Sequence, residues 1–296
     1  MPLLGAHMSI AGHPHKALLR GKEIGCHIIQ IFTRHRIKWS AKKLSEKEID
    51  EFYKTQKETS IIPVAIHNSY LINLASPRSN VRKKSFSTLL EEMEWAELLK
   101  IPYLVMHPGS HMGDGEKIGL KRIAEAINGL HDQIKDNHVM ILMEITAGQG
   151  TNLGYRFEHM AEIFDLIESR ERLGVCFDTC HAFAAGYDFR SKETYRRLLG
   201  QFDKIIGLNR LKLFHINDSK NRLGSRVDRH EHPGEGFIGL QAFSLFMNDP
   251  NFADLPFLLE TPKEMDKNGV NRDIINLNIL RNLVTAQVDR LKVEGF

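Results

Sequence analysis

Eight short apolar segments recur along the chain at nearly even intervals, and this repetition restricts the possible fold more than any other feature. Short continuous apolar runs are typical of strands that are buried on both faces, as in a parallel sheet. Amphipathic, charge-rich segments of helical length lie between them. The apolar segments are residues 3–6, 26–32, 61–66, 103–106, 139–143, 175–177, 211–214 and 257–259.

The segments between the predicted strands have the features of helices. The clearest are residues 45–59, 80–100, 117–135 and 156–169. The first opens on Ser45 and carries Glu48 three residues later, a combination that forms a capping box at a helix start. Strands that alternate with helices predict a parallel sheet in the α/β class, and eight such units predict a closed (β/α)8 TIM barrel.

An open, doubly wound sheet is the alternative arrangement of the same units. Such a sheet normally carries a glycine-rich G-x-G-x-x-G turn after its first strand. Residues 5–12 read Gly-Ala-His-Met-Ser-Ile-Ala-Gly and lack that spacing, so the barrel is favoured. No linker-like or low-complexity stretch interrupts the chain, and we predict a single domain over residues 1–296.

Composition excludes several classes of protein. No apolar run approaches the roughly 18 residues that a membrane-spanning helix needs, and the first residues do not resemble a secretory signal. Three cysteines, Cys26, Cys176 and Cys180, are too few for a disulfide framework, so we expect a cytoplasmic protein. Forty Lys and Arg against 37 Asp and Glu leave a net charge of +3, so a polyanionic partner would need a local patch or bound cations.

Six consecutive predicted strands are followed at once by a histidine or a carboxylate. In a barrel all strands point the same way, so the side chains at their carboxyl ends surround one mouth. Three carboxylates in one partly dehydrated pocket would repel one another unless a cation lay among them. Mixed nitrogen and oxygen ligands favour zinc, manganese or iron over calcium or magnesium. The six residues are His67, His107, Glu144, Asp178, His215 and Glu260.

Three further candidate ligands lie close to these strand ends. His181 follows Asp178 by three residues, and Asp228 with His230 forms an Asp-x-His pair. In extended backbone such a pair places both side chains on one face. Together they predict a His₂Asp site with an open position, which is the pattern of catalytic zinc. Nine ligands exceed the needs of one ion, so two or three metals are predicted, with Glu144 suited to bridge two of them.

Three long segments resemble the signatures of the endonuclease IV family, the zinc-dependent apurinic/apyrimidinic (AP) endonucleases. His67-Asn68-Ser69-Tyr70-Leu71-Ile72-Asn73-Leu74-Ala75 resembles the first signature, and Gly174-Val175-Cys176-Phe177-Asp178-Thr179-Cys180-His181 the second. His215-Ile216-Asn217-Asp218-Ser219-Lys220, with Gly224-Ser225 and Asp228-Arg229-His230, resembles the third. The similarity extends over almost the whole chain.

The resemblance implies a barrel that holds three zinc ions, with manganese possible at one site. It assigns His67, His107 and Glu144 to the first ion. The second takes Glu144 as a bridge with Asp178, His215 and Glu260, and the third takes His181, Asp228 and His230. The implied reaction is hydrolysis of the phosphodiester 5′ to an abasic site in double-stranded DNA, which leaves a 3′-hydroxyl and a 5′-deoxyribose phosphate. The implied catalytic residues are Glu144, Asp178 and Glu260.

The resemblance also implies DNA contacts at the mouth. Tyr70 and Leu71 directly follow His67 and are placed to fill the gap that an extruded abasic nucleotide leaves. Basic residues after the second and seventh strands would contact phosphates. Two positions depart from the family pattern, Ile37 where an intercalating arginine is common and Ile145 where asparagine is usual. The predicted DNA-contacting residues are Ser9, Arg34, Arg36, Lys38, Tyr70, Leu71, Lys220 and Arg222.

Two other functions are compatible with parts of this pattern. Sugar isomerases and epimerases of the xylose isomerase-like superfamily share the barrel and a metal-bearing rim, but they generally need fewer ligands. The His181, Asp228 and His230 group distinguishes the two classes. A DNA-binding protein with structural zinc is a third possibility, which open coordination positions disfavour. We expect a monomer with no organic cofactor.

Overall fold

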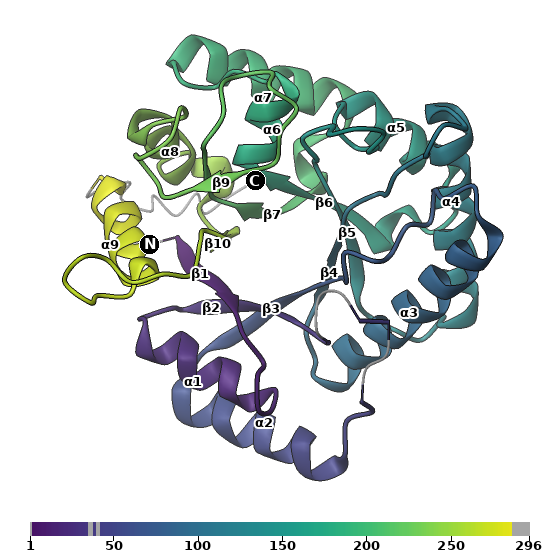
Figure 1. Ribbon diagram of the computed structural model, residues 1–296, viewed down its shortest axis with the longest axis horizontal. Helices are drawn as coiled ribbons and strands as arrows, with labels where there is room; N and C mark the ends of the chain where they lie inside the picture. Colours follow the sequence, from purple (N-terminus) through teal and green to yellow (C-terminus); the bar gives the residue numbers. More distant parts are fainter. Residues whose placement is uncertain (1, 35–37, 40–41, 286–296) are drawn as a thin grey trace, which may run out of the picture.

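The computed structural model describes residues 2–34, 38–39 and 42–285. Eight strands form a closed barrel in the order β1-β10-β7-β6-β5-β4-β3-β2, and every neighbouring pair is parallel, which confirms the predicted TIM barrel (Figure 1). The barrel strands are β1 (Leu3–Met8), β2 (Ile28–Phe32), β3 (Ile62–His67), β4 (Tyr103–Met106), β5 (Met140–Glu144), β6 (Leu173–Asp178), β7 (Leu211–His215) and β10 (Pro256–Leu259).

Helices surround the barrel in Figure 1, as the alternating pattern predicts. The capping box at the start of α2 is present, because the Ser45 hydroxyl accepts from the Glu48 backbone N–H and the Glu48 carboxylate accepts from that of Ser45. The helices are α1 (His15–Glu23), α2 (Glu46–Thr59), α3 (Ser79–Leu98), α4 (Glu116–Gln133), α5 (Phe157–Leu166), α6 (Thr179–Ala185), α7 (Lys192–Ile205), α8 (Leu240–Met247) and α9 (Arg272–Leu283).

Helix α5 ends three residues before the predicted limit at residue 169. The Asn128 side-chain amide of α4 donates to the Leu166 carbonyl, and its oxygen accepts from the Glu168 N–H. These bonds satisfy backbone groups that a further turn of helix would otherwise have used. A contact between two helices therefore sets the end of α5.

The barrel interior is divided into an apolar layer and a polar layer. Side chains alternate along a strand, so positions two apart face the same side. On β5, Leu142 belongs to the apolar interior cluster and Glu144 follows it at the mouth. On β7, Leu213 and His215 repeat this arrangement. Apolar side chains therefore fill the part of the barrel interior that precedes the strand ends. Polar groups occupy the carboxyl ends of the strands.

A short antiparallel hairpin, β8 (Asp218–Ser219) with β9 (His230–Glu231), follows β7 and was not predicted. The buried Asp218 carboxylate holds this region by accepting from the backbone N–H groups of Gly234 and Ile238 at 2.9 and 2.8 Å. A β-carbon at Gly236 would lie 2.4 Å from an Asp218 oxygen, so only glycine fits there. The hairpin brings His230 to the barrel mouth.

Candidate metal centre

Glu144, the last residue of β5, lies among imidazoles from several elements. One of its oxygens, Oε2, is 3.0 Å from His67 Nε2 and 3.2 Å from His107 Nε2. The other, Oε1, is 3.0 Å from His181 Nδ1 and 3.2 Å from His215 Nδ1. The position of Glu144 between two sets of ligands is the arrangement that a bridging carboxylate requires.

Two groups of ligand atoms share Glu144. His67, His107 and Glu144 form the first, in which one atom from each residue lies within 4.8 Å of the others. Asp178, His215 and Glu260 join Glu144 in the second, under the same distance limit. Within it, His215 Nδ1 is 3.2 Å from Glu260 Oε2 and 3.8 Å from Asp178 Oδ2. The structure thus brings together all six strand-end residues.

The third predicted group also assembles. His181 Nε2 lies 3.2 Å from Asp228 Oδ2 and 3.3 Å from His230 Nε2, while His230 Nε2 is 3.4 Å from Asp228 Oδ1. Cys180 lies close enough to Asp228 and His230 to complete another possible group, which the sequence did not indicate. Burial raises the pKa of the Cys180 thiol to about 12.

The electrostatics of the centre suit a divalent cation. Glu144 and Asp178 are fully buried. Burial would raise the pKa of Glu144, but the imidazoles of His107 and His215 outweigh it and hold this pKa well below the usual range. Imidazole nitrogens of His181 and His230 face each other at contact distance. Nitrogen and carboxylate donors that converge in this way fit zinc or a similar ion.

Backbone carbonyls orient several of these imidazoles. Nδ1 of His67 donates to the Asn68 carbonyl at 2.8 Å, and Nδ1 of His230 donates to the Glu260 carbonyl at 3.1 Å. Each bond places the ring proton on Nδ1 and leaves the Nε2 lone pair for the centre. Nδ1 of His181 lies 3.0 Å from the carbonyl of Ile145, one of the two positions that depart from the signatures that the sequence resembles.

Asn217 is a site residue that the sequence analysis missed. Its amide nitrogen donates to Asp178 Oδ2 at 2.8 Å, and its oxygen accepts from the Glu260 backbone N–H at 2.8 Å. It therefore holds two candidate ligands from different strands. Its place in the third signature segment, two residues after His215, was a signal, but asparagine is also favoured in ordinary turns.

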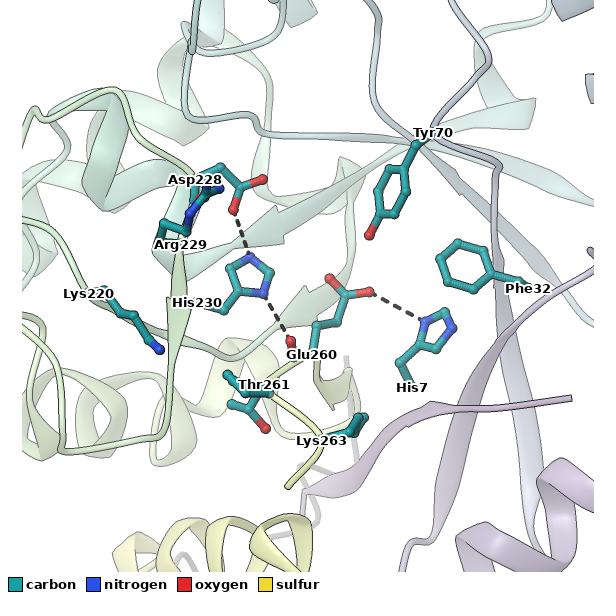
Figure 2. Close-up of a pocket in the computed structure, with 11 residues that line it drawn as sticks. His7, Phe32, Tyr70, Lys220, Asp228, Arg229, His230, Glu260, Thr261 and Lys263 are labelled. Atoms are coloured by element: carbon teal, nitrogen blue, oxygen red, sulfur yellow. Dashed lines mark hydrogen bonds and ion pairs between the residues drawn. The ribbon is translucent and has the colours of Figure 1, made fainter. Parts of the chain in front are cut away.

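A cavity of about 550 Å³ opens above the centre (Figure 2). The Tyr70 hydroxyl points into it from one side, and Asp228 and His230 lie opposite. Glu260 is the catalytic candidate that reaches the cavity, with a side chain that is 13% exposed. Tyr70 is 52% exposed, and its ring packs edge-on against Phe32 with centroids 5.8 Å apart.

The predicted DNA-contacting residues are only partly available. Lys38, Lys220, Arg222 and Ser9 are exposed, and Leu71 is half-buried beside Tyr70. Arg36 lies outside the described residues, as does Ile37.

The prediction for Arg34 is wrong. Its side chain is 1% exposed, and it pairs with Glu92 at 3.0 Å and Glu91 at 3.2 Å. Because two carboxylates already occupy its donors, it is not free to bind a phosphate.

Comparison with known proteins defines the class of the barrel. A sequence profile of the family described as xylose isomerase-like TIM barrel matches residues 18–279. D-psicose 3-epimerase has a similar structure, with a TM-score of 0.64 over 95% of this chain and 96% of that one, but only 16% sequence identity. That likeness shows the fold alone.

Two other comparisons are much stronger. The chain is 51% identical over 284 residues to a probable endonuclease 4 of Chloroflexus aurantiacus, covering 96% of this chain and 99% of the relative. It is 35% identical to the crystal structure of endonuclease IV from Thermus thermophilus, with a TM-score of 0.82 over 95% of this chain and 98% of that one. Within the xylose isomerase-like barrels, the chain belongs to the endonuclease IV family.

Proposed function

We propose that the chain is a zinc-dependent AP endonuclease. It hydrolyses the phosphodiester 5′ to an abasic site in double-stranded DNA and leaves a 3′-hydroxyl and a 5′-deoxyribose phosphate. The observation that carries this proposal is the third ligand group, in which His181, Asp228 and His230 lie within 3.4 Å of one another beside the two groups that share Glu144. Endonuclease names among relatives of about 50% identity support it.

Three ions fit the donor sets. His67, His107 and Glu144 would hold the first, and Glu144 would also serve the second. His181, Asp228 and His230 would hold the third, with manganese an alternative at one site. When bound, divalent ions neutralise phosphate charge and lower the pKa of water, which supplies a nucleophile at neutral pH. The ligands of the bridged second ion are Glu144, Asp178, His215 and Glu260.

The three catalytic carboxylates differ in their access to substrate. Glu144 and Asp178 are fully buried, so they can hold metal but cannot reach a water molecule in the cavity. Glu260 lines the cavity and keeps one carboxylate edge toward it (Figure 2). Because a group that orients water must lie within hydrogen-bond reach of it, Glu260 is the carboxylate placed to orient the attacking water beside the ion that it would help to hold.

Residues around the mouth bind the damaged duplex. An abasic nucleotide is extruded at little cost because it has no base to unstack. Tyr70 and Leu71 occupy the space that it vacates, and their contact favours the damaged site over intact DNA. The exposed side chains of Lys38, Lys220 and Arg222 contact phosphates on either side.

The chain acts as a monomeric domain over residues 1–296 without an organic cofactor, on chromosomal DNA in the cytoplasm. Among the helices in residues 2–34, 38–39 and 42–285, none has the length and apolar character that crossing a bilayer demands.

Elemental analysis combined with a cleavage assay tests the function. The purified protein should contain about three zinc ions per chain, and it should nick a duplex with one tetrahydrofuran abasic analogue on the 5′ side. An undamaged duplex of the same sequence is the control and should stay intact. One metal per chain, no nicking and activity on a ketose sugar would overturn the proposal in favour of an epimerase.

A further inference from the structure

Gln30 is a polar residue within the apolar strand β2, and the function described so far gives it no role. Its side chain is fully buried. It lies two residues after Ile28, which belongs to the apolar interior cluster, so it faces the barrel interior at the level of the metal centre. A buried amide is unfavourable unless its polar atoms are hydrogen-bonded, so its partners indicate why it is there.

The Gln30 amide contacts two candidate ligands at once. Its oxygen, Oε1, lies 3.0 Å from His215 Nε2. Its nitrogen, Nε2, donates to Glu260 Oε1 at 2.6 Å and lies 3.1 Å from His7 Nδ1. The opposite amide orientation would place two oxygens 2.6 Å apart and is excluded, because a carboxylate oxygen can only accept.

This orientation determines which His215 nitrogen carries the proton. Gln30 Oε1 can only accept, so His215 Nε2 must be the donor. The lone pair of the neutral ring is then on Nδ1, which lies 3.2 Å from both Glu144 Oε1 and Glu260 Oε2. A lone pair that faces two carboxylate oxygens is unfavourable without a cation between them.

We propose that Gln30 is a positioning residue for the metal group formed by Glu144, Asp178, His215 and Glu260. It makes His215 an Nδ1 ligand, and it engages Glu260 Oε1 so that Oε2 is left for the ion. Gln30 does not touch substrate, because it is fully buried beneath the cavity. The inference rests on the proposed metal centre, but it does not depend on DNA cleavage.

Zinc affinity of the Gln30→Leu variant tests the role. Leucine has a similar volume and removes all three polar contacts. In competition with a chromogenic chelator, and without DNA, one zinc ion should bind about 10- to 100-fold more weakly than in the wild-type protein. Gln201→Leu makes the same chemical change on the exposed surface of α7 and should leave all zinc affinities unchanged. A folded Gln30→Leu protein with wild-type zinc affinities would overturn the inference.

The wild-type protein allows a second measurement that does not require the variant to fold. In ¹⁵N-histidine spectra of the zinc-loaded chain, His215 should show a metal-bound Nδ1 and a protonated Nε2. A metal-bound Nε2 would overturn the inference even if AP cleavage were normal. A wild-type chain that binds no zinc would instead overturn the metal centre together with the proposed function, so the two failures are distinguishable.

Discussion

Glu144 makes contacts with four imidazoles, and it links the ligand groups directly. His67 and His107 approach one oxygen, while His181 and His215 approach the other. A fully buried carboxylate is stable only when opposite charge surrounds it. The four surrounding imidazoles therefore offset the cost of burying the Glu144 carboxylate.

Replacing Glu144 by Gln should abolish cleavage of a tetrahydrofuran-containing duplex. An amide offers one acceptor oxygen and no charge, so it cannot bridge two cations. We expect a loss of more than about 10³-fold in single-turnover rate, together with reduced zinc content. Glu125→Gln, on the exposed surface of α4, should behave as wild type. Unchanged cleavage by Glu144→Gln would contradict the bridging role.

Tyr70 and Leu71 should contribute to DNA binding without affecting the metals. Tyr70 lines the cavity and Leu71 follows it in the chain, which suits contact with the gap in the duplex. We expect the double variant Tyr70→Ala/Leu71→Ala to bind the abasic duplex at least about 10-fold more weakly in a fluorescence-anisotropy titration, with normal zinc content. Ile62→Ala, an exposed position at the opposite end of β3, is the control. Equal affinities would mean that the two residues only pack.

Strand β2 and helix α3 are joined by a buried ion pair beside the mouth. Glu92 of α3 accepts from the Thr33 hydroxyl at 3.2 Å and pairs with Arg34 at 3.0 Å. The Arg34 guanidinium also donates to the Trp39 carbonyl. Arg34, which the sequence suggested as a DNA contact, therefore pairs with α3 beside the mouth instead.

The ionisation of Glu92 should make stability depend on pH. Burial raises its pKa from the ordinary value of 4.5 to about 7, despite the nearby Arg34. The folded chain then binds this proton more tightly than the unfolded chain. The resulting stabilisation is complete below pH 4.5 and is lost as the pH rises through about 7, a change of about 3 kcal/mol.

Urea denaturation across this pH range measures the effect. In Glu92→Gln the side chain cannot ionise, so its free energy of unfolding should rise by about 3 kcal/mol relative to wild type between about pH 4 and pH 8. The neighbouring Glu91 also pairs with Arg34 but is 53% exposed, so Glu91→Gln is the matched control that removes a carboxylate from Arg34 without removing a buried one. Parallel pH curves for wild type and Glu92→Gln would contradict the assignment.

The molecule as a whole separates its functions along the barrel axis. Apolar packing fills the lower barrel, and the ligands gather where the strands end. Exposed Lys220 and Arg222 lie on the segment between β8 and β9, so positive charge is local although the net charge is only +3. A small net charge is therefore compatible with DNA binding when cations and basic residues share one opening.

The salt dependence of DNA binding should report this local charge. The logarithm of the DNA association constant falls linearly with the logarithm of the salt concentration, and each phosphate contact adds about 0.9 to the steepness of that fall. Lys220→Ala/Arg222→Ala should therefore lower the slope by about 2 for an abasic duplex. Lys54→Ala/Lys57→Ala removes two exposed charges near the carboxyl end of α2, away from the mouth, and should leave the slope unchanged. Equal slopes for both variants would contradict phosphate contact by Lys220 and Arg222.

Much of this arrangement follows from local pattern. Parallel strands place their carboxyl ends on one side, so the residue type that follows each apolar run already predicts the ring of six ligands. The Asp-x-His spacing of Asp228 and His230 likewise predicts their shared face. The hairpin β8–β9 escaped prediction because two-residue strands have no periodicity to detect.

Sequence pattern is sufficient for the barrel and its ligands because both depend on strand direction and side-chain alternation, which are properties of the local chain. Pairings between polar groups that lie far apart in the sequence cannot be predicted from local pattern. Gln30 and Glu260 are separated by 230 residues, and nothing near either one predicts their contact. The burial of Arg34 against Glu92 likewise required the packed structure, because hydrogen-bond partners and solvent access depend on distances that only the folded chain defines.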